Sequence, residues 1–325
     1  MTVKESVLKI LEKNREVSLS GEEIAKGLGV SRAAVWKAIK SLREEGYNIN
    51  SGTNKGYKLT NDNDLLSQEG IRLYLRKEYK ENIIKVYKTI DSTNKEAKKV
   101  LMDDDIPHGT VLISEEQTEG KGRFNRKFYS PNNKGIYMSV ILRPNIELSK
   151  AIHITTASAV SVCRAIEKLI KKYPKIKWVN DIFLDGKKIC GILTEATGNF
   201  ESGNVENVVV GIGINFKKHG DFPDELKSIA GALFKDENIS ITRNQLVGEI
   251  LNELLDMCEN LEDENIMKEY KELSFVIGKD VSYVKNNRLN KGKAVDIKDD
   301  GSLVIMLENG EVDYLNSGEI SLKKY

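Results

Sequence analysis

Ten residues near the middle of the chain, EGKGRFNRKF (119–128), combine two glycines with four cations. Glycine lets the backbone approach a ligand closely, and lysine and arginine attract negative charge, so such a loop is typical of a site that holds an anion. The phosphate-binding pattern G-x-x-x-x-G-K-[ST] occurs neither here nor elsewhere in the chain. The loop therefore predicts an anion site of another kind, and its composition leaves open which anion it holds.

Three further polar or glycine-rich stretches lie where strands are expected to end: DSTN (91–94), KWVND (177–181) and GIGIN (211–215). Together with the basic loop, they suggest strand ends that converge on one ligand. Lys177 lies in an otherwise apolar strand. Because a buried lysine is costly unless it is paired, an anion is expected beside it.

The side chains of these stretches differ in the chemistry they offer. The hydroxyl groups of Ser92 and Thr93 and the amide of Gln117 suit a compact, neutral polar head group. Gly211 and Gly213 share one face of a strand and would leave a flat surface for an apolar tail. The groups expected near negative charge are Gly120, Lys121, Gly122, Arg123, Arg126 and Lys177.

The segment that must position these groups mixes strands with helices, which predicts an α+β domain with a mixed sheet covered on one face by helices. The expected strands are IIKVYKTI, TVLISEEQ, GIYMSVILRP, IKWVNDIFL, ICGILTEA and NVVVGIGINF, with hairpin turns at 185–186 and 202–203. The expected helices are NKEAKKVLMD, 150–171, ITRNQLVGEILNELLDMCENL and EDENIMKEYKEL.

The first 60 residues follow a helix-turn-helix pattern. Ser20 and Glu23 form a capping box at the start of a short helix, and Ser31 caps a second helix that ends at Gly46. The second helix has an apolar stripe of Val35, Ile39 and Leu42. The stretch YNINSGTNKGYKLT then reads as a hairpin, so the segment is expected to be a winged helix-turn-helix.

This segment holds 11 Lys and Arg against 7 Asp and Glu, a local positive excess that suits DNA phosphates. A solvated helix face is the alternative, and Trp36 is more typical of a packing residue than of a base reader. The residues expected to meet DNA are Ser31, Arg32, Ala33, Trp36, Lys37, Lys40 and Lys55.

From about Phe275 onward the pattern contains short strands only, which predicts a small β-barrel resembling an SH3 fold. Turns are expected at Asp300-Gly301 and Asn309-Gly310. A polar joint lies at 60–67, so the predicted domains are a winged helix-turn-helix at 1–62, the α+β domain at 66–275 and the SH3-like domain at 276–325.

Composition narrows the classes of function. The formal net charge is +1, so any attraction to nucleic acid must be local, and no apolar run approaches the ~18 residues of a membrane span. The first residues are charged and amphipathic, unlike a signal peptide. The three cysteines and three histidines lack metal-ligand spacing, so we expect free thiols, no metal site and a cytoplasmic location.

These motifs, taken in order, resemble those of the biotin–protein ligases that also act as repressors of the biotin operon. The family's glycine-arginine loop, typically GRGRRGR, appears here as GKGRFNR, its KWPND motif as KWVND and its glycine strand as GIGIN. The resemblance extends to SRAAVWKAI in the helix-turn-helix and GEISL near the C-terminal end, so it covers all three segments.

The resemblance implies roles for individual positions. The contacts to the biotin head group would be Ser92, Thr93, Asn94 and Gln117, with Gly211 and Gly213 beside the tail. The loop residues Gly120, Lys121, Gly122 and Arg123 would close over biotin and the adenylate. Lys177 would contact the biotin carboxylate and the α-phosphate, so Lys177 and Arg123 are the expected catalytic cations. The nucleotide would also meet Arg126, Phe128 and Asn215.

The sequence departs from the family pattern at five positions. Lys121 replaces an arginine and so loses bidentate geometry, while Phe124 and Asn125 replace arginine and glycine. Phe128 replaces a tryptophan that stacks on adenine, and Val179 replaces a proline, which is expected to relax the local backbone. These changes concern ATP affinity more than activity.

The resemblance implies a two-step reaction with ATP, Mg²⁺ and biotin through biotinyl-5'-AMP, followed by transfer to a lysine of a biotin carboxyl carrier protein of acetyl-CoA carboxylase or a related carboxylase. Asn180 or Asp181 is the nearest candidate for contact with Mg²⁺. The adenylate would act as corepressor for a homodimer on operator DNA. The alternatives are a ligase whose winged helix does not bind DNA, a lipoate-type ligase, and a non-catalytic transcription factor that senses a small acid.

Overall fold

The computed structural model describes residues 2–52, 56–60, 64–102, 106–144, 146–197, 203–218, 222–235 and 239–322. The chain divides into two compact units. One unit comprises Met1–Glu81 and Ser240–Glu249, and the other comprises Asn82–Ile239 and Ile250–Tyr325. No helix within these described ranges is both long and apolar enough to cross a membrane.

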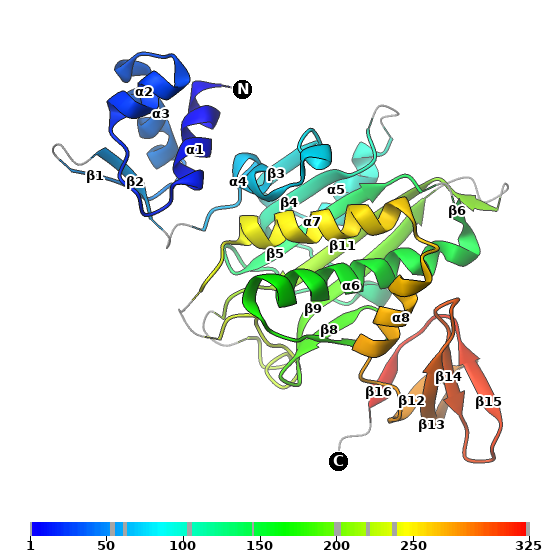
Figure 1. Ribbon diagram of the computed structural model, residues 1–325. Coiled ribbons are helices and arrows are strands. Elements are labelled where there is room, and N and C mark those ends of the chain that lie inside the picture. The colour runs from blue at the N-terminus through cyan, green and yellow to red at the C-terminus, as the bar shows by residue number, and fades with distance from the viewer. Residues whose placement is uncertain are drawn as a thin grey trace. The chain divides into compact units, whose positions relative to one another are not determined.

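The first unit contains the predicted winged helix-turn-helix (Figure 1). Its elements are α1 (Val3–Lys13), α2 (Gly21–Leu28), α3 (Arg32–Glu44), β1 (Ile49–Gly52) and β2 (Gly56–Leu59). The capping box at Ser20 and Glu23 is present, and the Ser31 hydroxyl accepts from the backbone of Ala34, as the sequence indicated. The stripe of α3 is buried against α1, and the two strands pair as an antiparallel wing.

Two further segments belong to this unit: α4 (Gln68–Tyr74), with the short helix η1 (Lys77–Tyr79), and the start of α7 (Arg243–Glu259). The guanidinium of Arg243 is fully buried, and its Nε donates to the Asp64 carboxylate at 3.0 Å. The Ser67 amide donates to the Asn244 side chain at 3.1 Å. A buried charge needs such a partner, so this pair ties 64–67 to the beginning of α7.

The second unit is built on a mixed sheet of seven strands, in the order β3-β4-β5-β11-β9-β8-β7. Only β3 and β4 run parallel among these neighbours, and the other pairs are antiparallel. The strands are β3 (Ile84–Ile90), β4 (Thr110–Gln117), β5 (Gly135–Leu142), β7 (Lys175–Lys177), β8 (Asp181–Leu184), β9 (Lys187–Thr197) and β11 (Asn207–Asn215). A separate two-stranded pair joins β6 (Ile146–Glu147) to β10 (Asn204–Val205), and short helices lie at η2 (Arg123–Asn125) and η3 (Leu148–Lys150).

Helices cover both faces of this sheet, so the expectation of a single covered face is wrong. The long helix α6 (Ala151–Ile170) crosses one face, with α8 (Glu264–Leu273) packed beside it (Figure 1). On the other face, α5 (Thr93–Val100) covers one end only, where Ala97 packs with Leu112 and Val209. The remainder of that face is available for a ligand.

The stretch IKWVNDIFL is not one strand, which corrects the prediction. It forms a hairpin in which β7 pairs with β8 and Lys177 faces Asp181 across the pair. The peptide bond between Trp178 and Val179 is cis. The hairpin turn predicted at Asp185-Gly186 is present with left-handed backbone at both residues, whereas Ser202 lies outside the described residues.

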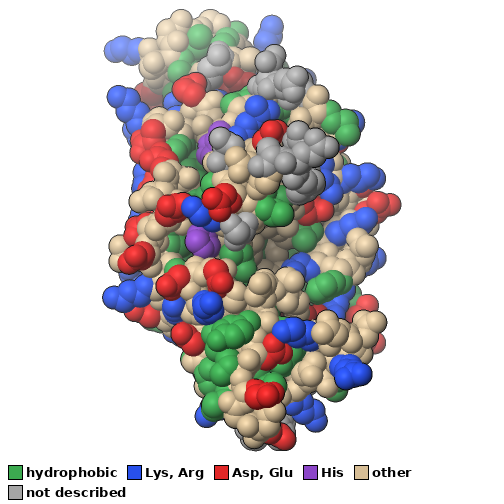
Figure 2. Space-filling view, turned by 90° about the vertical axis from the view of Figure 1, so that its right-hand side faces the viewer, with side chains coloured by type: hydrophobic (Ala, Val, Ile, Leu, Met, Phe, Trp, Pro, Cys, Tyr) green, Lys and Arg blue, Asp and Glu red, His purple; other side chains and the backbone are tan. Residues whose placement is uncertain are grey.

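The C-terminal strands form the predicted small sheet, in the order β15-β14-β13-β12-β16 (Figure 1). They are β12 (Asp280–Lys285), β13 (Arg288–Ile297), β14 (Leu303–Met306), β15 (Val312–Leu315) and β16 (Ile320–Leu322). Gly301 and Gly310 adopt left-handed backbone in the two predicted turns. Figure 2 shows acidic and basic side chains interspersed over the face it presents, in keeping with the small net charge.

Candidate active site and DNA-binding surface

A cavity of about 720 Å³ lies on the sheet face that α5 leaves open. It brings together residues from all four stretches that the sequence singled out. The predicted residues that line it are Ser92, Thr93, Asn94, Gln117, Lys121, Gly122, Arg123, Arg126, Phe128, Lys177, Gly211, Gly213 and Asn215. Gly120 is the exception, because it is buried beneath the loop against the Phe128 carbonyl and the Ser130 hydroxyl.

One end of the cavity, lined by Ser92, Thr93, Asn94 and Gln117, is a buried layer of neutral polar side chains and is called the head-group end below. Ser92 is the N-cap of α5, and the backbone amide of Thr93 donates to Gln117 Oε1 at 2.8 Å. The Thr93 hydroxyl lies 3.1 Å from the same oxygen. From the floor of the sheet, the fully buried Ser139 hydroxyl reaches Asn94 Oδ1 at 2.6 Å. Each of these groups is therefore fixed before any ligand binds.

Hydrogen-bond accounting shows what this end can still offer. Gln117 Oε1 accepts from Thr93, and its Nε2 donates to Ser130 at 3.1 Å, so its second N–H has no partner among the described residues. Asn94 Nδ2 donates to Glu195 at 2.8 Å, and its Oδ1 retains one lone pair beside Ser139. One donor and one acceptor facing the same space suit a group that carries both C=O and N–H, such as an amide or a urea.

The two glycines of β11 do not leave an empty flat surface, which corrects the expectation for an apolar tail. A Cβ at Gly211 would lie 2.2 Å from Asn94 Oδ1, and one at Gly213 would lie 2.6 Å from the Phe128 ring. Glycine is required because these two side chains rest on the strand. The rings of Phe128 and Tyr137 meet edge to face at 6.4 Å, so the middle of the cavity is aromatic.

The opposite end of the cavity gathers cations. Lys177 is half-buried, and burial lowers its pKa, although Asp181 and Glu319 act in the opposite direction. Among the described residues it has no ion-pair partner within 4.0 Å. Asp181 is instead paired with Lys188 at 2.6 Å. An anion entering this end would therefore meet a desolvated cation that no carboxylate neutralises directly.

Two arginines of the basic loop lie at the same end. Arg123 is half-buried, its Nη1 donates to Asn180 Oδ1 at 3.3 Å, and its guanidinium lies 5.2 Å from the centre of the Phe124 ring. Arg126 is more exposed, at 66%, and pairs at 2.6 Å with Glu319, which immediately precedes β16. Phe124 and Asn125, which replace arginine and glycine of the family loop, both have left-handed backbone.

Hydrogen bonds from distant parts of the chain fix the turn that follows Lys177. The Tyr270 hydroxyl of α8 donates to the Val179 carbonyl at 2.9 Å, and the Trp178 indole donates to the Gly301 carbonyl at 3.0 Å. Asn180 Nδ2 donates to the Ile192 carbonyl at 2.6 Å. Because these bonds come from α8, the C-terminal sheet and β9, the cation end depends on elements distant in sequence.

The predicted site residues omit three charged residues of the cavity, of which Lys127 belongs to the basic loop. Lys188 lines the cavity from β9, and Glu319 lines it from the stretch before β16. A signal for Lys188 existed, since it follows the Asp185-Gly186 turn that returns the chain toward Asp181. Glu319 lies 193 residues from its partner Arg126, so no local pattern could have indicated the contact.

The structure offers little of its own to a metal ion. No group of three or more His, Cys, Asp or Glu gathers in the part of the chain that is described. Of the two candidates, Asn180 bonds to Arg123 and Ile192, and Asp181 is paired with Lys188, so each already has a partner. A single carboxylate suits Mg²⁺ that arrives with a nucleotide and is held chiefly by its phosphates.

The α3 surface carries the residues expected at DNA. Ser31, Arg32, Ala33, Lys37 and Lys40 are exposed, whereas Lys55 lies outside the described residues. Trp36 is 56% exposed, and the Lys40 ammonium lies 5.8 Å from its ring centre. The reading of Trp36 as a packing residue is therefore wrong, because the apolar stripe of α3 points the other way.

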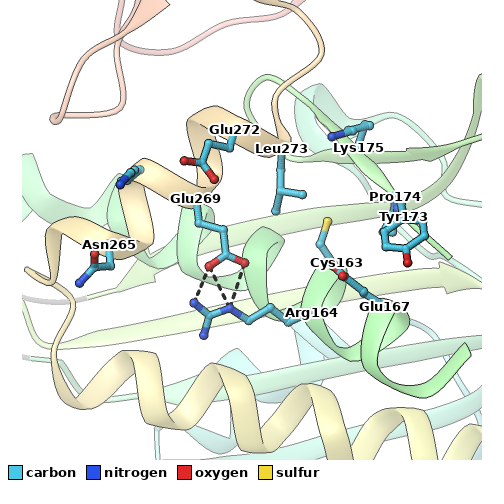
Figure 3. A pocket seen from close by; sticks show the side chains of 11 residues that line it. Cys163, Arg164, Glu167, Tyr173, Pro174, Lys175, Asn265, Glu269, Glu272 and Leu273 are labelled. Atoms are coloured by element: carbon cyan, nitrogen blue, oxygen red, sulfur yellow. Dashed lines mark hydrogen bonds and ion pairs between the residues drawn. The ribbon is translucent and has the colours of Figure 1, made fainter. Parts of the chain in front are cut away.

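A second hollow, of about 490 Å³, lies between α6 and α8 (Figure 3). Arg164 and Glu269 face each other across it, with Nε 3.0 Å from both carboxylate oxygens. None of the residues predicted at the ligand site lines it. The cavity on the open sheet face is therefore the candidate active site.

Comparison with known proteins identifies the same segments. Residues 3–58 match the HTH domain, residues 86–215 match the biotin/lipoate A/B protein ligase family, and residues 276–323 match the biotin protein ligase C-terminal domain. The chain is similar to the bifunctional ligase/repressor BirA of Bacillus subtilis, with 34% identity over 99% of both chains. It is also similar to BirA of Escherichia coli, with 28% identity over 94% of this chain and 92% of that one.

Solved structures share the fold over three quarters of the chain. The biotin protein ligase of Aquifex aeolicus in complex with biotin and ATP matches with a TM-score of 0.63 and 25% identity, covering 75% of this chain and all of that one. The apo structure of the same protein gives a TM-score of 0.60 at 23% identity.

Proposed function

Because this chain belongs to the family of biotin–protein ligases, in its group of bifunctional ligase/repressors, we propose that it activates biotin with ATP and transfers it to a carrier protein. The same chain represses transcription in response to biotin. The observation that carries the enzymatic part is one cavity with a hydrogen-bonding neutral end and a cationic end. Biotin has a urea at one end of its bicyclic ring and a carboxylate on its tail, so it needs both.

The neutral end suits the ureido head. We propose that the free N–H of Gln117 donates to the ureido oxygen and that the free lone pair of Asn94 Oδ1 accepts a ureido N–H. Ser92 and Thr93 complete this end from the first turn of α5. The tail then runs past Phe128 toward the cations, which lie at the opposite end of the same cavity.

Adenylation joins two anions, and the cationic end lowers their repulsion. The biotin carboxylate attacks the α-phosphate of ATP, the bond to pyrophosphate breaks, and biotinyl-5'-AMP remains. Lys177 and Arg123 supply positive charge where it develops on the phosphate, with Lys188 and Arg126 close by. Asn215, at the end of β11, is proposed to contact the nucleotide. Its side chain is positioned by a hydrogen bond from Nδ2 to the Gly231 carbonyl at 2.9 Å.

Transfer requires only a nucleophile from the partner. The ε-amine of a lysine on a biotin carboxyl carrier protein attacks the acyl carbon of the adenylate, and AMP leaves. The glycines and cations of the basic loop, Gly120, Lys121, Gly122 and Arg123, close over the mixed anhydride and shield it from water. Mg²⁺ would accompany ATP and offset the charge of its phosphates, and Asp181, which lines the cavity, could contact it.

Repression uses the first unit. We propose that α3 enters the major groove with Arg32, Trp36 and Lys37, and that Lys40 and the wing hold phosphates. Ordering of the basic loop by the adenylate would favour a homodimer on a two-fold symmetric operator. We propose that the protein acts in the cytoplasm, beside the carboxylases whose carrier it would modify.

One incubation tests the central proposal. The protein is mixed with biotin, Mg-ATP and a carrier domain, and the carrier is weighed by mass spectrometry. We expect one added biotinyl group, and an unmodified carrier would contradict the ligase assignment. Competition between biotin and lipoate for adenylation distinguishes a biotin ligase from a lipoate-type ligase. Exchange of pyrophosphate into ATP distinguishes an enzyme from a non-catalytic transcription factor that senses a small acid.

A gel shift with the biotin operon control region tests repression. Operator binding should strengthen when biotin and ATP are present together. Arg32→Ala or Lys37→Ala should weaken the shift, because each removes an exposed cation of α3. If operator binding is the same with and without biotin and ATP, the protein is a ligase whose winged helix has no regulatory role.

A further inference from the structure

Glu195 of β9 contacts the head-group end without lining the cavity itself. Its two carboxylate oxygens accept from two residues of α5 that lie one helical turn apart. Oε2 accepts from Asn94 Nδ2 at 2.8 Å, and Oε1 accepts from Lys98 Nζ at 2.9 Å. Asn94 is buried, whereas the Lys98–Glu195 pair is partly open to solvent.

This carboxylate decides which way the Asn94 amide points. On its other side Asn94 meets the Ser139 hydroxyl, which can donate or accept and so would tolerate either orientation. Glu195 can only accept while it is ionised, so it requires Nδ2 on its own side. The Leu193 carbonyl has the same requirement but lies farther away, at 3.3 Å.

Glu195 is ionised under ordinary conditions. Burial raises the pKa of its carboxyl group, but hydrogen bonds from Lys98 and Asn94 more than compensate, and the pKa is lowered overall. The amide orientation that follows places Asn94 Oδ1 over Gly211, and both residues line the cavity. Among the described residues, this oxygen accepts only from Ser139, so one lone pair is left for a ligand in the cavity that Asn94 lines.

We propose that Glu195 is a positioning residue for biotin: by holding Asn94 Nδ2, it presents Asn94 Oδ1 as the acceptor for one ureido N–H. The inference rests on the proposed function and adds a residue outside the cavity that sets specificity for the head group. It concerns biotin alone, because the proposed site for ATP is the cationic end of the cavity.

Matched variants distinguish the effect of the Glu195–Asn94 hydrogen bond from that of the Glu195–Lys98 ion pair. Glu195→Met keeps the length of the side chain but cannot accept, whereas Glu195→Gln retains one acceptor oxygen. Lys98→Met removes the solvent-exposed ion pair and leaves the bond to Asn94 intact. Glu195→Ala provides a second acceptor-free variant if the methionine variant folds poorly, and thermal melting checks each protein.

Steady-state adenylation by the full chain gives the readout. For Glu195→Met we expect KM for biotin to rise about 10-fold, with KM for ATP within about 2-fold of the wild type, because one hydrogen bond to a charged group is lost. Glu195→Gln should recover most of the affinity. Lys98→Met should change KM for biotin by less than about 2-fold, as for other exposed pairs.

A ligand change identifies the contact. Biotin methylated at one or the other ureido nitrogen is compared with biotin, and the wild type should reject one isomer more strongly. That preference should shrink in Glu195→Met and persist in Glu195→Gln, since only an oriented Asn94 distinguishes the two N–H groups. A purely structural defect would lower activity toward biotin and both isomers alike.

Unchanged KM for biotin and an unchanged isomer preference in Glu195→Met and Glu195→Ala would overturn the inference. A rise in both KM values together would also overturn it, because the effect would then be general. If the wild type forms no biotinyl-AMP at all, the proposed function fails, and that outcome is distinct from either of these.

Discussion

The two ends of the cavity achieve recognition in different ways. At the head-group end, Thr93 and Asn94 of α5 are buried, and both are hydrogen-bonded to the buried Ser139 of β5. At the cationic end, Lys177 lacks an ion-pair partner among the described residues, and Arg126 is held by an exposed pair with Glu319. One end is complete before binding, and the other is completed by its ligand.

The difference between the two ends follows from the charge of the ligand group that each is proposed to bind. A neutral urea gains most from donors and acceptors that are already oriented, because their ordering cost is met during folding. Phosphates and a carboxylate bring negative charge that half-buried cations otherwise lack. A cationic end neutralised in advance would bind anions weakly. The comparison therefore predicts that substitutions at the cationic end change the rate of adenylation, whereas those at the head-group end change biotin affinity.

The largest effect should come from Lys177→Ala. Loss of a preorganised cation at the developing charge should slow adenylate formation by about 10²–10³, measured as pyrophosphate release. Lys175→Ala is the matched control, because Lys175 lies on the same strand but lines the hollow between α6 and α8. Near-normal adenylation in Lys177→Ala would contradict the prediction that the cationic end sets the rate of adenylation.

Gly211→Ala tests the head-group end. The added methyl group would lie 2.2 Å from Asn94 Oδ1, so Asn94 must give up its bonds to Ser139 and Glu195. We expect KM for biotin to rise by about 10-fold or more, with little change in KM for ATP. Gly27→Ala, in α2 with nothing within 4 Å, is the control. Equal losses toward both substrates would argue against two independent ends.

The pH dependence of adenylation should report Lys177. Burial lowers the pKa of its ammonium group, so the cation is lost as pH rises through a value below that of an ordinary lysine. Activity should therefore decline on the alkaline side at a lower pH than an exposed lysine would produce. In Lys177→Arg, which stays protonated, the decline should move to higher pH. Identical profiles would remove Lys177 from this role.

The smallest effect should come from Glu319→Gln. Removing this carboxylate frees Arg126, whose pair is exposed, and leaves one less anion near Lys177. KM for ATP should fall by about 2- to 5-fold at low salt, and the gain should vanish at high salt. A rise in KM for ATP would mean that Glu319 serves to position Arg126.

Much of the local structure could be predicted because its causes are local. The capping box at Ser20, the cap at Ser31 and the turn at Asp185-Gly186 depend on residues a few positions apart. The KWVND stretch was misread as one strand because apolar residues flank it, while the turn is held by Tyr270 and Gly301 from elsewhere in the chain.

The sequence by itself determined the residue types: glycines where a strand must accept a side chain, cations in a loop, and a helix-turn-helix with a positive face. Only the tertiary structure decided that Asn94 and Phe128 fill the places over Gly211 and Gly213, that Glu319 reaches Arg126, and that Trp36 is exposed. The physical reason is that hydrogen bonds and packing act over a few ångströms in space, whereas sequence patterns report only neighbours along the chain.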